Sequence, residues 1–343
     1  MKKILFFTLL FSITSGLLYG QVPIAGIIDY YGKGITAEAC KLCLNFNEND
    51  SIAFVDDDMK YAAAKTKIEK CLLKIPKVKH AEITFVCCTL PDNYWMIYAG
   101  ADTTYQTVLT SNFTADVRLP KSIHSGYKKI NDLLFEAIEK NEATEDIRHG
   151  HAIMLYEPVR KIQLSYIAFA DTSLKLLKNV LANSKYAEER EVAATVIGYY
   201  HNKKLILNDL LKSISDPDVA VRNNAIRTIN IITDYANSNQ KLDIKINPDP
   251  FINLLNSISW TDRNKSSLVL LSLTEDRDTV LLEKIKKSAL ESIIDMATWK
   301  NFGHSLPGYI LLGRIIGWQE QVIMSGINNE RNFQVQEMLK YLN

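Results

Sequence analysis

Hydrophobic positions in the stretch 204–235 recur at helical spacing on two successive segments. In the first segment they fall at i, i+3, i+4 and i+7, as Leu207, Leu210, Leu211 and Ile214. In the second they again form one stripe, made of Val221, Ala225, Ile229 and Ile232. This spacing predicts two amphipathic helices, each with one apolar face and one polar face. Neither helix can bury its stripe alone, so each is expected to pack against further helices.

A short polar corner separates the two predicted helices, and it reads Ser215, Asp216, Pro217 and Asp218. We expect Asp216 to be the N-cap of the second helix, because its carboxylate can accept hydrogen bonds from the first free amides. Pro217 suits the first helical position, where a missing N–H has no cost. Asp218 then lies at the positive end of the helix dipole.

Weaker copies of this pattern flank the central pair on both sides. Upstream, apolar residues recur in two short runs, namely Leu174, Leu177 and Leu181, then Val192, Val196 and Tyr200. Downstream the spacing i, i+3, i+4, i+7 returns as Phe251, Leu254, Leu255 and Ile258. An Arg-x-x-Ala motif at Arg190 matches the one at Arg222. A preserved pattern at uneven spacing is typical of stacked helical hairpins with loops of variable length.

The central unit, with SDPDVAVRNNAIRTI across its corner, resembles a HEAT repeat of the short bacterial type. The match is good over 205–235 and loose near 173–200 and 250–273. The resemblance implies an α-solenoid that binds other macromolecules. It also implies structural roles for Asp216, Pro217 and Arg222, with the arginine tying adjacent repeats together.

The N-terminal part has a different pattern. Thr36 is expected to cap a short helix, 37–46, and a second helix is expected from about Asp57 to Lys74, where Pro76 ends it. Alternating residues then predict a β-hairpin near 81–100, with a turn at 91–93 and a further short strand at 116–119. We therefore expect a small α+β domain over 21–125, followed by a mainly α-helical, HEAT-like repeat domain over 126–343.

The remaining helices are expected from apolar spacing at 120–139, 159–170, 282–299, 309–318 and the C-terminus. Asp171 is expected to cap the first repeat, and 301–308 to form a Gly/Pro loop. The longest irregular connection is 236–250. It is either a surface insertion, which we favour, or a projecting loop that touches a ligand. An amphipathic last helix suits the closing end of a solenoid.

Residues 1–20 have two lysines, an uncharged apolar core and a small residue at the end, which indicates a secretory signal peptide. We therefore expect a periplasmic or extracellular protein with no transmembrane segment after signal removal. Without Lys2 and Lys3 the chain has 38 basic and 39 acidic residues. This neutral balance disfavours a nucleic-acid partner, which usually needs a basic face.

Five cysteines lie in the N-terminal part: Cys40, Cys43, Cys71, Cys87 and Cys88. Export permits disulfides, and the odd count leaves one thiol free or paired with another chain, while spacing does not determine the connectivity. Cys40-x-x-Cys43 also fits a thiol oxidoreductase, although the usual preceding strand is not evident. A zinc site is disfavoured, because adjacent cysteines on a strand point to opposite faces.

His149-Gly150-His151 is the other candidate for chemistry. With a carboxylate such as Asp146 it would suit a metal-dependent hydrolase, but the sequence places no third ligand. Loop histidines without a metal are the favoured interpretation. No catalytic motif and no cofactor fingerprint is found.

The first functional hypothesis is therefore an exported, non-enzymatic scaffold that binds a protein or peptide partner. Candidate contact residues lie off the apolar stripes of the second helices, and they are Glu191, Thr195, Arg227 and Asn230. The alternative is an enzyme, either a thiol-disulfide oxidoreductase at Cys40 and Cys43 or a metal-dependent hydrolase at His149 and His151.

Overall fold

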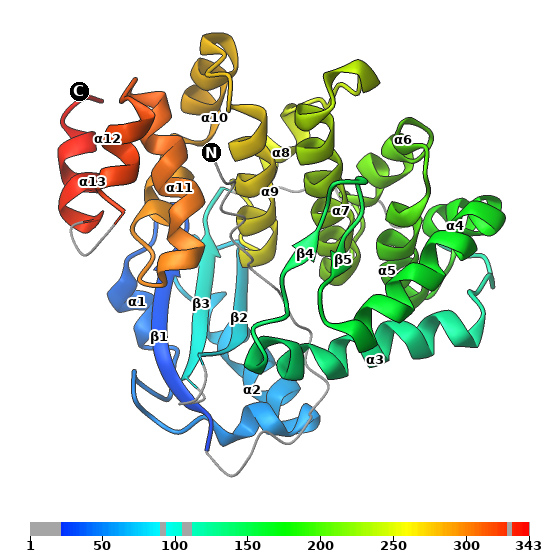
Figure 1. The fold of residues 1–343 in the computed structure, drawn as a ribbon. Coiled ribbons are helices and arrows are strands. Elements are labelled where there is room, and N and C mark those ends of the chain that lie inside the picture. Colours follow the sequence, from blue (N-terminus) through cyan, green and yellow to red (C-terminus); the bar gives the residue numbers. More distant parts are fainter. Residues whose placement is uncertain (1–21, 90–93, 105–111, 328–330, 343) are drawn as a thin grey trace. The chain divides into compact units, whose positions relative to one another are not determined.

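A computed structural model describes residues 22–89, 94–104, 112–327 and 331–342, with no side-chain description at 88 and 89. The expected signal peptide at 1–20 and the expected turn at 91–93 lie outside these residues. The protein is mainly helical, with a small sheet near its N-terminus (Figure 1). It groups into two compact units, 1–106 with 251–343 (unit 1) and 107–250 (unit 2). Residues 251–343 thus group with the sheet, whereas the sequence suggests a boundary near 125.

The sheet of unit 1 has three strands in the order β1-β3-β2: β1 (Ile24–Tyr31), β2 (His80–Thr89) and β3 (Tyr94–Asp102). β2 and β3 pair antiparallel, which agrees with the hairpin predicted near 81–100. β1 pairs parallel with β3, and it is not among the strands predicted from the sequence. Its burial does not alternate, so β1 lacks the simple period of a half-buried strand.

One face of the sheet packs against two helices, α1 (Ala37–Lys41) and α2 (Asp58–Leu72), with a short 3-10 turn, η1 (Ala53–Asp56), before α2. The Thr36 side chain caps α1, as the sequence predicts, and the Asp57 side chain caps α2, near the predicted start of that helix. This layer is an apolar core whose largest members include Phe46, Ile68, Leu72, Phe85 and Trp95.

The opposite face of the sheet contacts the ends of helices that come from the other end of the chain. These are α9 (Trp260–Leu273), α10 (Thr279–Ala297) and α11 (Phe302–Ile315), and α8 (Asp249–Leu254) precedes them in the chain. The Tyr31 hydroxyl donates to the Ile258 carbonyl, and the Lys300 amide donates to the Asp29 carboxylate. The sheet is therefore covered on both faces within unit 1.

Aromatic residues dominate this second layer. The Tyr98 ring stacks on Trp260 with centroids 4.9 Å apart and lies 5.1 Å from the Trp299 ring. The Tyr98 hydroxyl lies 2.5 Å from His304 Nδ1. Burial lowers the pKa of His304 to about 3, so its ring is neutral and accepts this hydrogen bond.

Side chains protect both edges of the sheet. The Glu48 carboxylate accepts a hydrogen bond from the Ile28 amide on β1. On β2, Glu69 accepts from the Ile83 amide and Lys65 donates to the Ile83 carbonyl. These contacts occupy backbone groups that would otherwise be free to pair with another strand.

The C-terminal helices of unit 1 differ in detail from the prediction. α11 begins at Phe302 and contains Pro307, so the expected Gly/Pro loop at 301–308 is largely helical. Its N-cap is Asn301, whose side chain accepts from the His304 amide. Two short helices follow, α12 (Glu320–Ser325), which the sequence does not predict, and α13 (Arg331–Leu339).

Unit 2 consists of helices that pack on one another in sequence order. They are α3 (Lys121–Glu139), α4 (Glu157–Asn183), α5 (Ala187–Val196), α6 (Lys203–Ser213) and α7 (Val219–Ser238). The second helices α5 and α7 pack side by side, and so do the first helices α4 and α6. A 3-10 turn, η2 (Ile197–Tyr199), ends the α5 segment.

Three loops of unit 2 depart from expectation. α4 runs through Asp171 with a non-helical residue at Ser173, so Asp171 caps no repeat; its carboxylate contacts His201 instead. The polar stretch 141–151 belongs to a small hairpin, β4 (Glu145–Asp146) paired with β5 (Ile153–Met154). The connection 236–250 is partly ordered, because α7 continues to Ser238 and η3 (Gln240–Leu242) follows.

None of the helices in the described part of the chain has the length and hydrophobicity that a membrane crossing requires.

Candidate functional site

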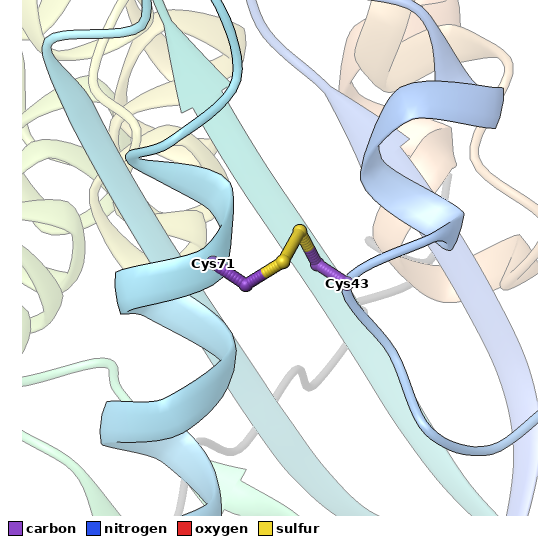
Figure 2. The surroundings of a disulfide bond; sticks show 2 residues. All are labelled: Cys43 and Cys71. Atoms are coloured by element: carbon purple, nitrogen blue, oxygen red, sulfur yellow. A yellow bond between two sulfur atoms is a disulfide. The ribbon is translucent and has the colours of Figure 1, made fainter.

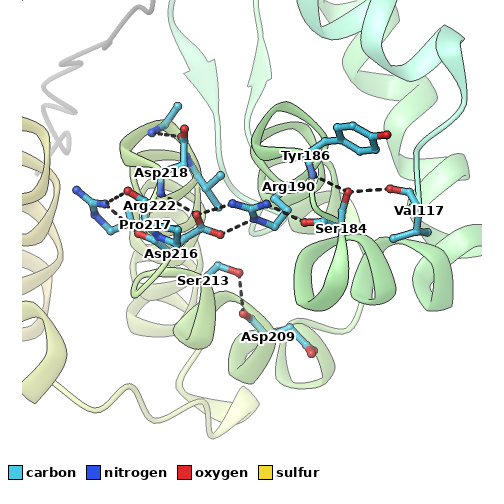
Figure 3. A network of polar contacts seen from close by, with 12 residues as sticks. Val117, Ser184, Tyr186, Arg190, Asp209, Ser213, Asp216, Pro217, Asp218 and Arg222 are labelled. Carbon is cyan, nitrogen blue, oxygen red and sulfur yellow. Dashed lines mark hydrogen bonds and ion pairs between the residues drawn. The ribbon is translucent and has the colours of Figure 1, made fainter. Parts of the chain in front are cut away.

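The corner between α6 and α7 is held by a buried ion pair (Figure 3). The Arg190 guanidinium, which comes from α5, donates twice to the Asp216 carboxylate, through Nε at 2.7 Å and Nη2 at 2.9 Å. Its Nη1 donates to the Ser184 carbonyl at 2.8 Å. The arginine of one hairpin thus reaches the corner of the next hairpin, and both side chains are almost fully buried.

The predicted capping of α7 is wrong by two residues. Asp218 is the N-cap, and its carboxylate accepts from the amides of Ala220 and Val221. Pro217 precedes the helix. Asp216, which the sequence analysis assigns to the cap, instead accepts hydrogen bonds from the Asp218 amide and from Arg190. Its carboxylate therefore forms the ion pair and does not cap α7.

Three arginines make the same backbone contact at three successive hairpins. Each donates to the carbonyl six residues before it: Arg190 to Ser184, Arg222 to Asp216, and Arg263 to Ser257. Arg222 also donates to the Pro217 carbonyl at 3.1 Å. The residue separation is the same in all three contacts, although the donor is Nη1 in Arg190 and Arg222 and Nε in Arg263.

The four candidate contact residues lie on one surface of α5 and α7, which we call the polar face. It comprises Glu191, Thr195, Asn224, Arg227 and Asn230, joined by Tyr127 from α3 and Glu145 from β4. Thr195 follows Glu191 by one turn, and the three α7 residues are spaced by three, so they share a helix side.

Glu191 is bound by its own chain. The Tyr127 hydroxyl donates to Glu191 Oε1 at 2.9 Å, and Asn224 Nδ2 donates to the Tyr127 hydroxyl at 2.8 Å. Burial raises the pKa of Glu191, an effect that its hydrogen bond with Tyr127 partly offsets. Glu191 is therefore a positioned, half-buried acid rather than a solvated surface charge.

Arg227 is also engaged within unit 2. Its Nη2 lies 2.5 Å from Glu145 Oε2, and the Glu145 side chain is almost completely buried. Burial disfavours the charge on Arg227, but the adjacent Glu145 carboxylate outweighs that effect and holds its pKa above the ordinary range. The arginine thus binds a carboxylate from an extended segment.

The same extended segment makes a second contact with these hairpins. The Tyr199 hydroxyl, just after α5, donates to the Ala152 carbonyl at 2.9 Å, and the His151 ring stacks on Tyr199. Arg227 and Tyr199 therefore hold the two sides of the β4–β5 hairpin, one through a carboxylate on β4 and the other through a backbone carbonyl next to β5. Extended peptides offer the same two groups.

Part of the polar face is not used by these contacts. Asn230 Oδ1 is buried and accepts no hydrogen bond from the residues that the structure describes, and Thr195 is half-buried on α5. An acceptor left in this condition is costly, so it is usually satisfied by water or a ligand. The sequence analysis names four residues of this face. It misses Asn224 on α7, and it misses Tyr127 and Glu145, which lie far away along the chain and carry no local signal.

The cysteines are arranged differently from the predicted redox motif. Cys43, after α1, forms a disulfide with Cys71 of α2, with Cα atoms 5.5 Å apart (Figure 2). The disulfide joins the two helices that cover the sheet, and it is compatible with an oxidising compartment. Cys43 is therefore paired with Cys71 and not with Cys40.

Cys40 is a buried free thiol, and burial raises its pKa to about 11. A reactive cysteine needs a stabilised thiolate at neutral pH, and this environment has the opposite effect. Cys87 is disulfide-bonded, and the side chain of Cys88 lies outside the described residues. The arrangement gives no support to a Cys40–Cys43 dithiol.

His149 and His151 do not form a metal site with a third ligand in the described part of the chain, where no cluster of three suitable side chains occurs. Their ring centroids are 6.2 Å apart. His151 Nδ1 faces the Lys203 ammonium at 3.4 Å, and burial together with this lysine lowers the pKa of His151 to about 4. The positive charge of Lys203 would repel a metal ion bound at His151.

Comparison of the chain with protein-family models and with curated protein sequences finds no match.

Proposed function

We propose that the protein is an exported, non-enzymatic scaffold of HEAT-type helical hairpins that binds a protein or peptide partner in extended conformation. The observation that carries this proposal is the contact between the polar face and the β4–β5 segment. There Arg227 binds the Glu145 carboxylate and Tyr199 binds a backbone carbonyl. A partner peptide would use the adjoining part of the face, around the half-buried residues Thr195 and Asn230.

The three equivalent arginine contacts support the repeat part of the proposal. Arg190, Arg222 and Arg263 each fix the corner of their own hairpin, as expected if the hairpins are copies of one unit. Export is supported by the apolar N-terminal stretch and by the Cys43–Cys71 disulfide.

Random peptides displayed on phage and selected against the purified full chain would test the proposal. We expect selected peptides to carry an acidic residue, and their affinity to fall at least tenfold, roughly 1.4 kcal/mol, in Thr195→Ala/Asn230→Ala. The melting temperature should not change, because Asn230 Oδ1 has no partner to lose. Arg227 is unsuitable as the reporter, since its removal leaves Glu145 buried and unpaired.

Asn208→Ala is the matched control, because Asn208 is exposed on the first helix of the same hairpin. Peptides that bind the double variant as tightly as the wild type would refute the polar face as the binding site. A double variant that loses several degrees of thermal stability would instead make Thr195 and Asn230 structural residues.

A further inference from the structure

Lysines are concentrated in one short stretch of unit 1. Residues 60–79 contain seven lysines and a single acid, Glu69, so this stretch carries a charge of +6. The whole chain carries +1, which leaves −5 for the remainder. The near-neutral total therefore hides a strongly polarised charge distribution.

Most of these lysines are exposed. Lys67 and Lys70 lie on α2, on the side away from the buried residues Ile68 and Leu72, which pack on the sheet, and Lys74 follows two residues after the helix. Two further exposed lysines, Lys77 and Lys79, follow in the segment between α2 and β2. We call these five lysines the basic face.

Within the described residues, no carboxylate forms an ion pair with a lysine of the basic face, whereas Lys60 and Lys65 of the same stretch are paired with Asp57 and Glu69. The only acid in the stretch, Glu69, is engaged by Lys65 at 3.3 Å and by the Ile83 amide. Lys70 lies in the last turn of α2, where it complements the helix dipole, but Lys74, Lys77 and Lys79 lie after that helix. Helix stabilisation thus accounts for only part of the cluster.

The composition of the basic face distinguishes between anionic partners. The stretch 60–79 contains no arginine, the residue that binds single phosphates of nucleic acids through two hydrogen bonds. The one aromatic residue of this stretch, Tyr61, packs inward on Phe85 and offers no stacking surface. Lysines suffice for a diffuse negative surface, such as that of a bilayer with anionic lipids.

An apolar side chain stands among these lysines. Leu73 is 46% exposed, next to Lys74 and the exposed Pro76. Surfaces that dock on membranes combine basic residues with apolar side chains that enter the headgroup region. We propose that α2 and the turn that follows it, with the basic face and Leu73, form a docking surface for a bilayer rich in anionic phospholipid.

Flotation of the full chain with vesicles tests this proposal. The probes are vesicles of phosphatidylcholine alone and vesicles in which about one third of the lipid is phosphatidylglycerol. We expect binding only to the anionic vesicles, with loss of binding at high salt. Lys67→Gln/Lys70→Gln/Lys74→Gln should lower the partition coefficient on the order of a hundredfold, and Leu73→Gln by a smaller factor.

Lys121→Gln/Lys128→Gln/Lys129→Gln is the matched control, because it removes the same charge from exposed positions on α3 in unit 2. Equal losses in the two triple variants would overturn the proposal, since net charge alone would then explain binding. Binding that survives in the basic-face variant would also overturn it. So would retention on a soluble polyanion such as heparin with no vesicle binding.

Discussion

The buried ion pair between Arg190 and Asp216 allows a sharp test of what holds unit 2 together. Asp216→Asn keeps the size of the side chain but removes its charge. One oxygen, Oδ2, accepts from Arg190 Nε, while Oδ1 accepts from Arg190 Nη2 and from the Asp218 amide. The asparagine therefore retains its oxygen for one side and turns an NH2 group toward Arg190 Nε.

The expected loss is large because the arginine stays buried without its counter-charge. Both side chains are at most 4% exposed, and removing one partner of such a pair costs about 3–5 kcal/mol. For a unit of this size that loss corresponds to a fall in melting temperature of roughly 10 °C. Asp209→Asn breaks the more exposed pair with Lys178 and should cost less than about 1 kcal/mol.

The tryptophans allow the two units to be followed separately. All four belong to unit 1, as Trp95, Trp260, Trp299 and Trp318. In urea titrations, tryptophan fluorescence therefore reports unit 1, whereas far-ultraviolet circular dichroism reports both units. The Asp216→Asn variant should lose stability in the circular dichroism transition.

A loss in Asp216→Asn no greater than that in Asp209→Asn would refute the reasoning, because the buried pair would then contribute as little as a surface pair. The double variant Arg190→Met/Asp216→Leu supplies a further check. It should be more stable than Asp216→Asn, since neither charge remains buried.

Three further predictions concern unit 1. Burial raises the pKa of Asp29 to about 6, above its unfolded value, so this group costs stability increasingly as the pH rises from about 4 to 6. Asp29→Asn should therefore raise the free energy of unfolding by up to about 3 kcal/mol at neutral pH and hardly at pH 4. Equal gains at both pH values would contradict this expectation. Cys43→Ser/Cys71→Ser removes a disulfide that closes a loop of sequence separation 28, so the free energy of unfolding of unit 1, measured by urea titration, should fall by about 3.5 kcal/mol. An unchanged midpoint of the urea transition would refute this expectation. Tyr98→Phe leaves the buried His304 ring without its hydrogen-bond donor and should lower the free energy of unfolding by about 1–3 kcal/mol in thermal melts. Because the His304 ring is neutral, this loss of stability should not depend on pH above 5. A pH-dependent loss would show that the ring is charged.

The sequence predicts best those elements whose signal is local. The stripe that begins at Leu207 defines α6, the side chains of Thr36 and Asp57 define two helix starts, and alternation defines the pairing of β2 with β3. Each of these depends on residues within one or two turns of one another, so pattern and propensity suffice.

Prediction fails where a distant residue decides the structure. Asp216 has the composition of an N-cap, but Arg190 takes its carboxylate and Asp218 caps the helix instead. Similarly, Asp29 is buried in β1 because it accepts from the Lys300 amide, a partner 271 residues away. No local pattern contains such information.

The candidate sites divide in the same way. Helical spacing places Glu191 and Arg227 on one face, yet it cannot show that Tyr127 and Glu145 already contact them. The basic face is the opposite case, because seven lysines in 60–79 can be counted directly in the sequence. Only the structure adds that six of them are exposed, together with Leu73.

The discontinuous composition of unit 1 has a consequence for the order of events during synthesis. The strands that bear Tyr31 and Tyr98 leave the ribosome long before α9, α10 and α11, which later cover these rings, have been translated. Unit 2 is continuous, so it can close its own core in the interval. The aromatic face of the sheet therefore stays exposed until the C-terminal helices have been synthesised. A chaperone that binds this nascent segment should raise the yield of native protein more than a chaperone that binds residues 107–250.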